Sequence, residues 1–271
     1  MAATAELAII GTGNIGRAMA LGLVAAGRCE PARIILTRRK AEALDDLAAH
    51  GFQTQTDNRD ATRRAAIVIV AVEPRQLDGV LAEIAPELEP GRHLLVSVVS
   101  GAAIGDILRQ VGKPVPIVRA MPNTAIALGR SMTCLATTTD VPAVRRRVAE
   151  IFDCVGLTLF IDEELMIPAT ALCACGIAFF LRAVRAAAQG GIEIGFHPDE
   201  AVRMAAQTAL GAASLVLRAD RHPEREIDSV TTPRGCTISG LNQMEHQGFS
   251  SAMIKGITTS ADKARTLYSR Q

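Results

Sequence analysis

The sequence predicts an α/β domain built on a doubly wound, mostly parallel sheet, followed by an all-helical domain. Three observations support this prediction. Short apolar runs alternate with amphipathic segments from Leu7 to about Leu159, a glycine-rich turn joins the first run to a helical pattern, and only helical patterns follow Asp162. We therefore expect one domain over residues 1–162 and a second over residues 163–271.

The expected strands are short runs of aliphatic and β-branched residues. Helices between them would cover both faces of the sheet, as parallel strands require. The runs are Leu7–Ile10, Arg33–Thr37, Ile67–Val72, His93–Val98, Pro116–Arg119, Met132–Thr137 and Leu157–Phe160.

The expected helices of the second domain follow one another directly, with Pro198 and Gly248 marking two of the starts. They are Glu163 to about Gln189, Asp199–Ala219, Cys236–Gln247 and Ser250–Leu267.

The helix from Glu163 to Gln189 is apolar nearly all round. Pro168 and Thr170 interrupt its most apolar stretch, which meets Arg182, so we expect it to fall short of a membrane span and to be a buried helix. One small domain cannot cover every face of such a helix. We expect the same helix of a second subunit to cover it, in a homodimer or an assembly of dimers.

Composition excludes several classes of function. A formal net charge of +1 gives nucleic acid no electrostatic reason to bind, and we see no secretion signal before the first strand, so a cytoplasmic protein is expected. The 6 cysteines are expected to be reduced thiols. Cys173 and Cys175 would point apart on a helix, so no metal site is expected. The histidines are scattered and no serine elbow is present, which argues against a hydrolase.

The glycine turn carries the first functional signal. The strand at Leu7–Ile10 leads directly into Gly11-Thr12-Gly13-Asn14-Ile15-Gly16. Gly11 permits a tight turn, Gly13 lets a pyrophosphate approach the backbone, and Gly16 lets the helix pack closely on the strand. The sequence therefore predicts a dinucleotide on the N-terminus of this helix.

The end of the second strand indicates which dinucleotide. A site that prefers NAD has an acidic residue there to hold the ribose 2′-hydroxyl, but this chain has Thr37-Arg38-Arg39. Because arginine matches the geometry of a phosphate, we expect NADP(H), with Thr37 as a further donor to the 2′-phosphate.

Two later segments, together with the glycine turn, carry a resemblance to a known family. They are Val118-Arg119-Ala120-Met121-Pro122-Asn123-Thr124 and the run from Asp228 to Leu241, which contains Thr232-Pro233-Arg234-Gly235-Cys236-Thr237. Over essentially its whole length the chain resembles pyrroline-5-carboxylate reductase. The resemblance implies a Rossmann domain, a helical dimerisation domain and the reduction of a cyclic imine to proline with NAD(P)H.

The resemblance also implies roles for single residues. It places Ala71, Val72 and Pro74 with the glycine turn at the cofactor, and Met121, Pro122 and Asn123 around the nicotinamide. The substrate carboxylate would rest on the catalytic pair Thr232 and Thr237, at a turn that starts a helix. Arg234, Gly235, Cys236 and Cys175 would complete the substrate site.

Several departures from the family pattern leave alternatives open. Glu73 stands where the family has lysine, Cys173-Ala174-Cys175 replaces a serine- and glycine-rich motif, and Arg234 replaces a glycine. The substrate is then either pyrroline-5-carboxylate or another cyclic imine such as pyrroline-2-carboxylate, or the chain binds cofactor without efficient catalysis. The Arg234 side chain either enters the substrate site or points to solvent. A β-hydroxyacid dehydrogenase is disfavoured, because no lysine lies between Lys113 and Lys255.

Overall fold

The computed structural model describes residues 5–219 and 222–266. The chain forms two compact units: the first contains the residues up to Cys175 and the segment from Ser260, and the second contains Gly176–Thr259.

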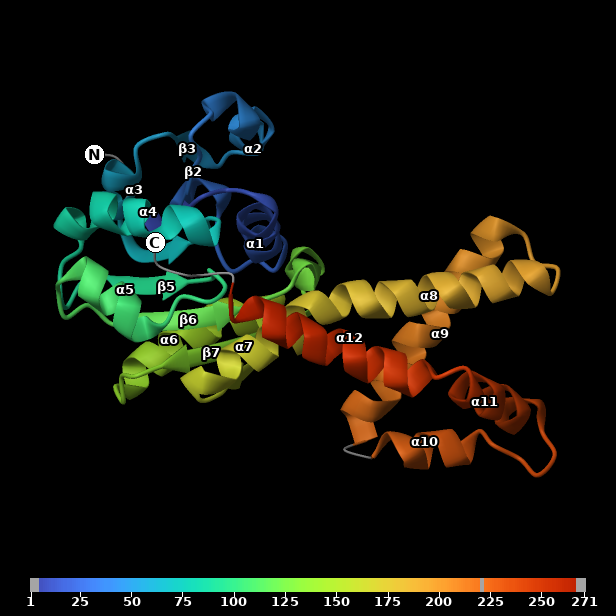
Figure 1. Ribbon diagram of the computed structural model, residues 1–271. Helices are drawn as coiled ribbons and strands as arrows, with labels where there is room; N and C mark the ends of the chain where they lie inside the picture. Colours follow the sequence, from blue (N-terminus) through green and yellow to red (C-terminus); the bar gives the residue numbers. More distant parts are fainter. Residues whose placement is uncertain (1–4, 220–221, 267–271) are drawn as a thin grey trace. The chain divides into compact units, whose positions relative to one another are not determined.

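The first unit is built on an eight-stranded sheet with the order β3-β2-β1-β4-β5-β6-β7-β8 (Figure 1). All neighbouring strands are parallel except β6 and β7, which are antiparallel. The strands are β1 (Ala5–Ile10), β2 (Ile34–Thr37), β3 (Gln53–Gln55), β4 (Ala65–Val70), β5 (Leu94–Ser97), β6 (Ile117–Met121), β7 (Ser131–Thr137) and β8 (Gly156–Phe160). The predicted α/β fold with a doubly wound sheet is therefore confirmed.

Helices cover both faces of the sheet, which explains why its central strands are apolar on both sides. Alternate strand residues such as Ile9 and Ile69 pack with α1 (Asn14–Ala25), α2 (Asp45–Ala49) and α6 (Pro142–Phe152) on one face. Their neighbours Ile10 and Val70 pack with α3 (Asn58–Arg64), α4 (Leu77–Ile84) and α5 (Ile104–Val111) on the other. Short 3₁₀ helices join these elements: η1 (Pro31–Arg33), η2 (Ala41–Leu44), η3 (Pro74–Gln76), η4 (Ala85–Glu87), η5 (Thr124–Leu128), η6 (Asp153–Val155) and η7 (Glu163–Leu165).

One helix contact within the first unit brings two backbones unusually close together. The middle of α1 lies against η5, the turn that follows β6, and a Cβ added to Gly22 would lie 2.3 Å from the carbonyl oxygen of Ile126. Only glycine leaves room for this approach between the two elements.

A buried ion pair stands next to the end of β6. Arg119 Nη1 lies 3.1 Å from Glu163 Oε1, and the same carboxylate accepts the backbone N–H of Ile104, the first residue of α5. Arg119 is buried, and its Nε and Nη2 atoms have no hydrogen-bond partner. Glu163 therefore balances a buried cation and caps a helix at once.

The helical segment Glu163–Glu193 changes its winding along its length. After η7 it runs as α7 (Met166–Ala169), then as the π-helix η8 (Thr170–Cys175), then as α8 (Gly176–Glu193). Within the described residues it is the segment that is long and apolar enough to cross a membrane by length and composition, which the sequence reading did not expect. In the single chain Phe180 and Leu181 are 63% and 62% exposed, so the chain alone leaves this helix uncovered, and the predicted cover by a second subunit stays a prediction here.

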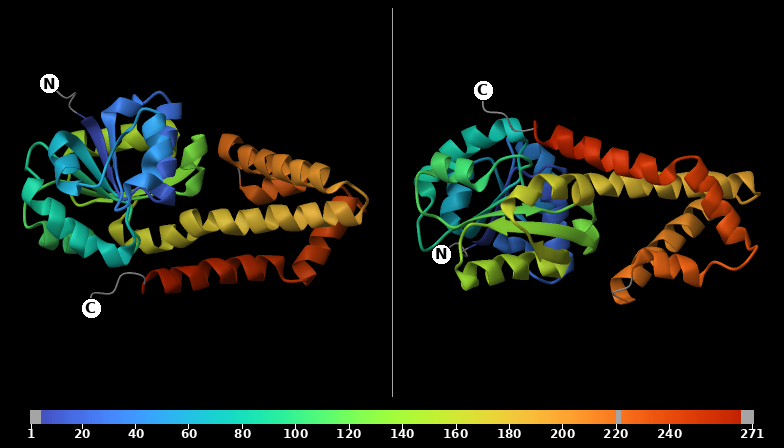
Figure 2. Two further views of the ribbon diagram at one scale, coloured as in Figure 1. Left: turned by 90° about the horizontal axis from the view of Figure 1, so that it is seen from above. Right: turned by 60° about the horizontal axis from the view of Figure 1, so that its bottom comes forward.

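The second unit is helical. It contains α8, α9 (Pro198–Ala219), α10 (Pro223–Ser229), α11 (Cys236–His246) and most of α12 (Phe249–Ala264). Figure 2 shows α8 and α12 running side by side, and between them Phe179, Ala183, Met253 and their neighbours line an apolar cavity of about 290 Å³. The predicted end of the last helix at Leu267 lies outside the described residues.

Candidate functional site

The glycine turn has the tight geometry that its sequence predicts. Gly11 has a φ of +91°, and a Cβ there would lie 2.4 Å from Val72 Cγ1 and 2.8 Å from the carbonyl oxygen of Ala71. A Cβ on Gly16 would lie 2.8 Å from the carbonyl oxygen of Gly11. Both positions require glycine, because a side chain at Gly11 would clash with the residues that follow β4 and one at Gly16 would clash with the backbone of the turn.

The N-terminus of α1 is prepared for an anion. Gly13 at the N-cap provides no side-chain hydrogen bond, and the first turn of the helix contains no acidic residue. No atom would contact a Cβ on Gly13 within 4 Å, so the space in front of the turn is open. The buried Thr12 hydroxyl has no hydrogen-bond partner. The first N–H groups of α1 have no partner within the helix, and with open space in front of Gly13 they fit the pyrophosphate of a dinucleotide.

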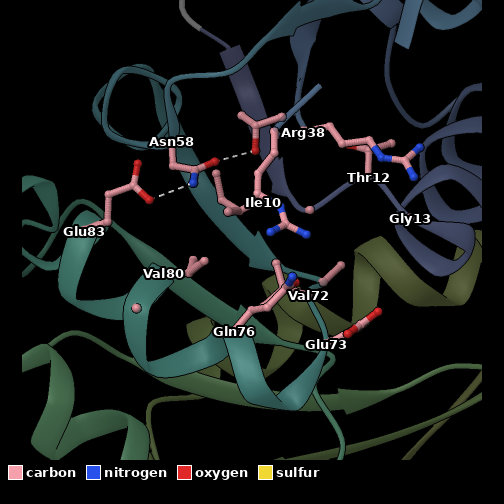
Figure 3. A pocket seen from close by; sticks show the side chains of 15 residues that line it. Ile10, Thr12, Gly13, Arg38, Asn58, Val72, Glu73, Gln76, Val80 and Glu83 are labelled. Atoms are coloured by element: carbon pink, nitrogen blue, oxygen red, sulfur yellow. Dashed lines mark hydrogen bonds between the residues drawn. The ribbon is translucent and has the colours of Figure 1, made fainter. Parts of the chain in front are cut away.

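A cavity of about 380 Å³ extends from this turn along the carboxyl ends of β1, β2 and β4 (Figure 3). Of the predicted cofactor residues, Gly11, Gly13, Thr37, Arg38, Arg39, Ala71 and Val72 line it. The remaining ones are Asn14, Ile15 and Gly16 on α1, Pro74 on η3, and Met121, Pro122 and Asn123, and none of them lines this cavity.

The two arginines and Thr37 have different roles in this cavity. Arg38 and Arg39 are exposed side chains on the wall. Thr37 is fully buried, its hydroxyl donates to Asn58 Oδ1 at 2.6 Å, and its carbonyl accepts the backbone N–H groups of Gly11 and Thr12. Thr37 thus supports the glycine turn, and the two arginines are the groups available for a phosphate.

Asn58 is a residue that the sequence reading missed. It begins α3, accepts from Thr37 and donates through Nδ2 to Glu83 Oε2 at 2.9 Å, so it joins β2 to α4 across the floor of the cavity (Figure 3). The local signal was limited to Asp57, which caps α3 and marks a helix start.

The unusual Glu73 has a local partner. Arg75 Nε donates to Glu73 Oε2 at 2.7 Å, and both side chains are more than half exposed. The negative charge that replaces the family's lysine is therefore balanced by a neighbouring arginine at the rim of the cavity, although an exposed pair of this kind contributes little to stability.

The predicted nicotinamide residues lie at the end of β6, and all three are buried. Asn123 makes several bonds there: its N–H donates to Ser131 Oγ, its Oδ1 accepts the N–H of Ala125, and its Nδ2 donates to the carbonyl of Cys173 at 3.2 Å. This one side chain fixes the end of β6 to η5 and to η8. Cys175, a predicted substrate residue, is the last residue of η8.

The predicted carboxylate loop lies in the second unit. Gly235 donates its N–H to the carbonyl of Thr232 at 2.9 Å, which closes a turn around Pro233 and Arg234. Arg234, the second central residue of this turn, is exposed and has a φ of +61°, a left-handed conformation that type II turns need at this position and that glycine adopts most readily. Cys236 and Thr237 begin α11, whose N-cap, Gly235, makes no side-chain hydrogen bond. The loop therefore offers free backbone donors to an anion.

Metal chemistry has no visible basis in the described part of the chain. Residues 5–219 and 222–266 contain no group of three or more His, Cys, Asp and Glu side chains placed to hold an ion. Two histidines have structural roles. His93 is buried and its ring bonds to the N–H of Glu89 and the carbonyl of Thr62, and His222 caps α10.

Comparison with known proteins supports both parts of this description. A family model described as pyrroline-5-carboxylate reductase dimerisation matches residues 163–267, and one described as NADP oxidoreductase, coenzyme F420-dependent, matches residues 6–101. Pyrroline-5-carboxylate reductase 2 of Dictyostelium discoideum is 47% identical over 96% of this chain and 92% of that protein. The chain belongs to the pyrroline-5-carboxylate reductase family.

Further members of the family agree. Pyrroline-5-carboxylate reductase 1 of Dictyostelium discoideum is 53% identical over 98% of this chain, which spans half the length of that relative. The solved structure of a pyrroline-5-carboxylate reductase from Coxiella burnetii is 29% identical with a TM-score of 0.88, and the match covers 98% of this chain and 100% of that one. The predicted family and the predicted class, an NAD(P)H-dependent reductase, are confirmed. The dimerisation model also covers the exposed apolar helix, so that surface belongs to a region used for oligomerisation.

Proposed function

We propose that this chain reduces pyrroline-5-carboxylate to proline and that NADPH is the hydride donor. The observation that carries the proposal is the cavity next to the glycine turn. It combines an uncapped helix N-terminus for the pyrophosphate with Arg38 and Arg39 at the end of β2, where an NAD site would have an acidic residue.

The cofactor preference follows from the charge of that wall. Arginine donates two parallel hydrogen bonds to a phosphate, and such charge-assisted bonds are stronger than neutral ones. Arg38 and Arg39 would hold the 2′-phosphate of NADP(H). Glu83 lies on the same cavity wall, and its carboxylate accepts a hydrogen bond from Asn58 Nδ2 at 2.9 Å.

The bound cofactor supplies a hydride from its nicotinamide to the imine carbon. In this proposal Met121, Pro122 and Asn123 hold the nicotinamide ring, and the side-chain bonds of Asn123 to Ala125 N–H and to the Cys173 carbonyl keep that side chain in one orientation. An imine protonated in water is already electrophilic at carbon, so these residues are needed for positioning rather than for acid or base catalysis.

The loop at Thr232–Thr237 would hold the carboxylate of the substrate. Its supporting features are the free N–H groups at the start of α11 and the hydroxyls of Thr232 and Thr237. Gly235, Cys236 and Cys175 would complete the surroundings of the substrate. The exposed Arg234 could pair with the same carboxylate, and in that case Arg234→Gly should raise the KM for the imine about tenfold or more while NADPH binding is unchanged.

The assembly proposed is a homodimer or a multiple of it. Exposed Phe180, Leu181 and Leu172 in the helix Glu163–Glu193 are supporting observations, because a surface this apolar is normally covered. Light scattering at low micromolar concentration should give a dimer or a larger even assembly. Phe180→Asp should then aggregate or fail to fold; an active, well-folded monomer would contradict the proposal.

The test of the activity is an NADPH oxidation assay on the purified chain. Pyrroline-5-carboxylate should be reduced faster than pyrroline-2-carboxylate. Thr237→Val should slow it, while the matched control Thr258→Val, an exposed position on α12, should not. Faster turnover of another imine would reassign the substrate. Tight NADPH binding with no turnover on any imine would leave a cofactor-binding paralogue without efficient catalysis.

A further inference from the structure

Two cysteine side chains from distant parts of the first unit are in contact. Cys134 lies on β7 and Cys173 lies in η8, 39 residues later, and their Sγ atoms are 3.9 Å apart. Both are free thiols. A disulfide needs an S–S distance of about 2.05 Å, so rotation of the side chains and an approach of roughly 2 Å would join them.

The π-helical winding explains how this contact arises. In a regular helix Cys173 and Cys175 would share no face, and nothing in their spacing indicates a partner. The wider turn Thr170–Cys175 places Cys173 among Met121, Cys134 and Met166, and packs it against β7. Inserted turns of this kind are frequent at functional sites.

The two thiols differ in access and in chemistry. Cys134 is buried at 4% exposure, whereas Cys173 is half-buried. The hydrogen bond from the Cys134 thiol lowers the pKa of Cys173 to about 7, against the opposing effect of burial. That hydrogen bond, together with burial, raises the pKa of Cys134. Cys173 is therefore the accessible thiol with thiolate character, and Cys134 is the protonated neighbour.

We propose that Cys134 and Cys173 form a reversible oxidation site that responds to peroxides. The Cys173 thiolate attacks one oxygen of hydrogen peroxide, the O–O bond breaks, and Cys173 sulfenic acid and hydroxide are formed. The Cys134 sulfur then attacks the sulfenic sulfur, the S–O bond breaks, and a disulfide and water result. The two sulfurs together lose two electrons, which the peroxide gains, and a dithiol reductant reverses the change.

The position of the pair gives the oxidation a consequence for catalysis, and this step rests on the proposed function. Cys134 is paired in register with Met121 across β6 and β7, and the carbonyl of Cys173 accepts the hydrogen bond of Asn123. Both neighbours of the disulfide are thus residues proposed to hold the nicotinamide. A displacement of about 1 Å at a reacting group can slow a reaction about a hundredfold, so the oxidised enzyme should be at least tenfold slower.

The experiment treats the full chain with hydrogen peroxide and maps its disulfides by mass spectrometry of non-reduced peptides. We expect a peptide pair linked through Cys134 and Cys173 and a loss of activity, while the Kd for NADPH is unchanged. Dithiothreitol should break the link and restore the activity. Cys134→Ser should keep the activity of the reduced enzyme and leave a sulfenic acid at Cys173 that dimedone traps. Cys134→Ala provides a second variant if serine disturbs the buried strand, and Cys154→Ser is the matched control that should remain sensitive to peroxide.

The outcomes separate this inference from the proposed function. A disulfide that maps to Cys175 or Cys236, a link between two chains, or no link at all would overturn the oxidation site whatever the substrate is. A Cys134–Cys173 link in an enzyme that does not reduce pyrroline-5-carboxylate would support the site and contradict only the proposed substrate.

Discussion

The ion pair between Arg119 and Glu163 predicts that its two members contribute very differently to stability. The Arg119 side chain is 4% exposed, whereas that of Glu163 is 28% exposed. Glu163 also accepts the N–H of Ile104, the first residue of α5, which has no partner within the helix. The acid therefore supports two groups, while the base depends on one.

The perturbation is Glu163→Ala. It leaves the guanidinium buried without an anion, and breaking a buried pair in this way costs about 3–5 kcal/mol. Loss of the helix cap adds about 1 kcal/mol. Since Glu163 is partly hydrated, we take the lower end and expect the free energy of unfolding to fall by roughly 4 kcal/mol in total.

The matched change is Arg119→Met, which removes the buried charge and keeps an unbranched apolar chain of similar length. Glu163 then remains partly hydrated and still caps α5. We expect a loss below about 1.5 kcal/mol, because buried pairs replaced by apolar groups are often neutral.

Urea unfolding followed by circular dichroism measures both changes. The double variant Arg119→Met with Glu163→Ala should be more stable than Glu163→Ala alone, since it no longer contains an unpaired cation. Equal losses in the two single variants, or a double variant less stable than either, would refute the reasoning.

Three further predictions concern single side chains. Arg38→Ala should raise the KM for NADPH about tenfold or more and leave NADH kinetics nearly unchanged, because a charge-assisted bond contributes about 1.5–3 kcal/mol; equal losses with both cofactors would remove the 2′-phosphate assignment. Burial lowers the pKa of His93, so its contribution to the free energy of unfolding should be fully present above about pH 6.5 and should be lost as the pH drops through the folded pKa. In a pH series of thermal unfolding, His93→Gln should flatten that part of the curve. Arg234→Gly should stabilise the chain by about 0.5–1 kcal/mol in a thermal melt, since relief of a positive φ outweighs the added freedom of the unfolded chain; a lower melting temperature would mean that the arginine makes stabilising contacts.

The sequence was informative where local chemistry decides the structure. The glycine turn was predictable because each glycine has a steric reason that the order strand, turn, helix already contains, and the structure gives Gly11 the expected positive φ. The strands at the centre of the sheet were predictable because burial on both faces makes them continuously apolar. β3 was missed because Gln53, Thr54 and Gln55 are polar and form a short edge strand.

Other features depend on contacts that no local pattern records. The π-helical turn and the approach of Cys173 to Cys134 arise from packing between segments 39 residues apart. Asn58 became part of the candidate site only because the strand and the helix beside it bring Thr37 and Glu83 within hydrogen-bond distance. The proposed substrate loop was suggested by the family resemblance, since its residues alone predict no more than a turn before a helix.

The close approach of Gly22 to Ile126 has a consequence for the reach of the cofactor site. Helix α1, which starts at the proposed pyrophosphate site, and η5, which follows the strand proposed to hold the nicotinamide, approach each other closely through their backbones at Gly22 and Ile126. In that proposal, main-chain atoms limit the distance between the two ends of a bound dinucleotide. A larger residue at position 22 would push the two ends apart, and a cofactor of fixed length would then fit one end or the other, but not both.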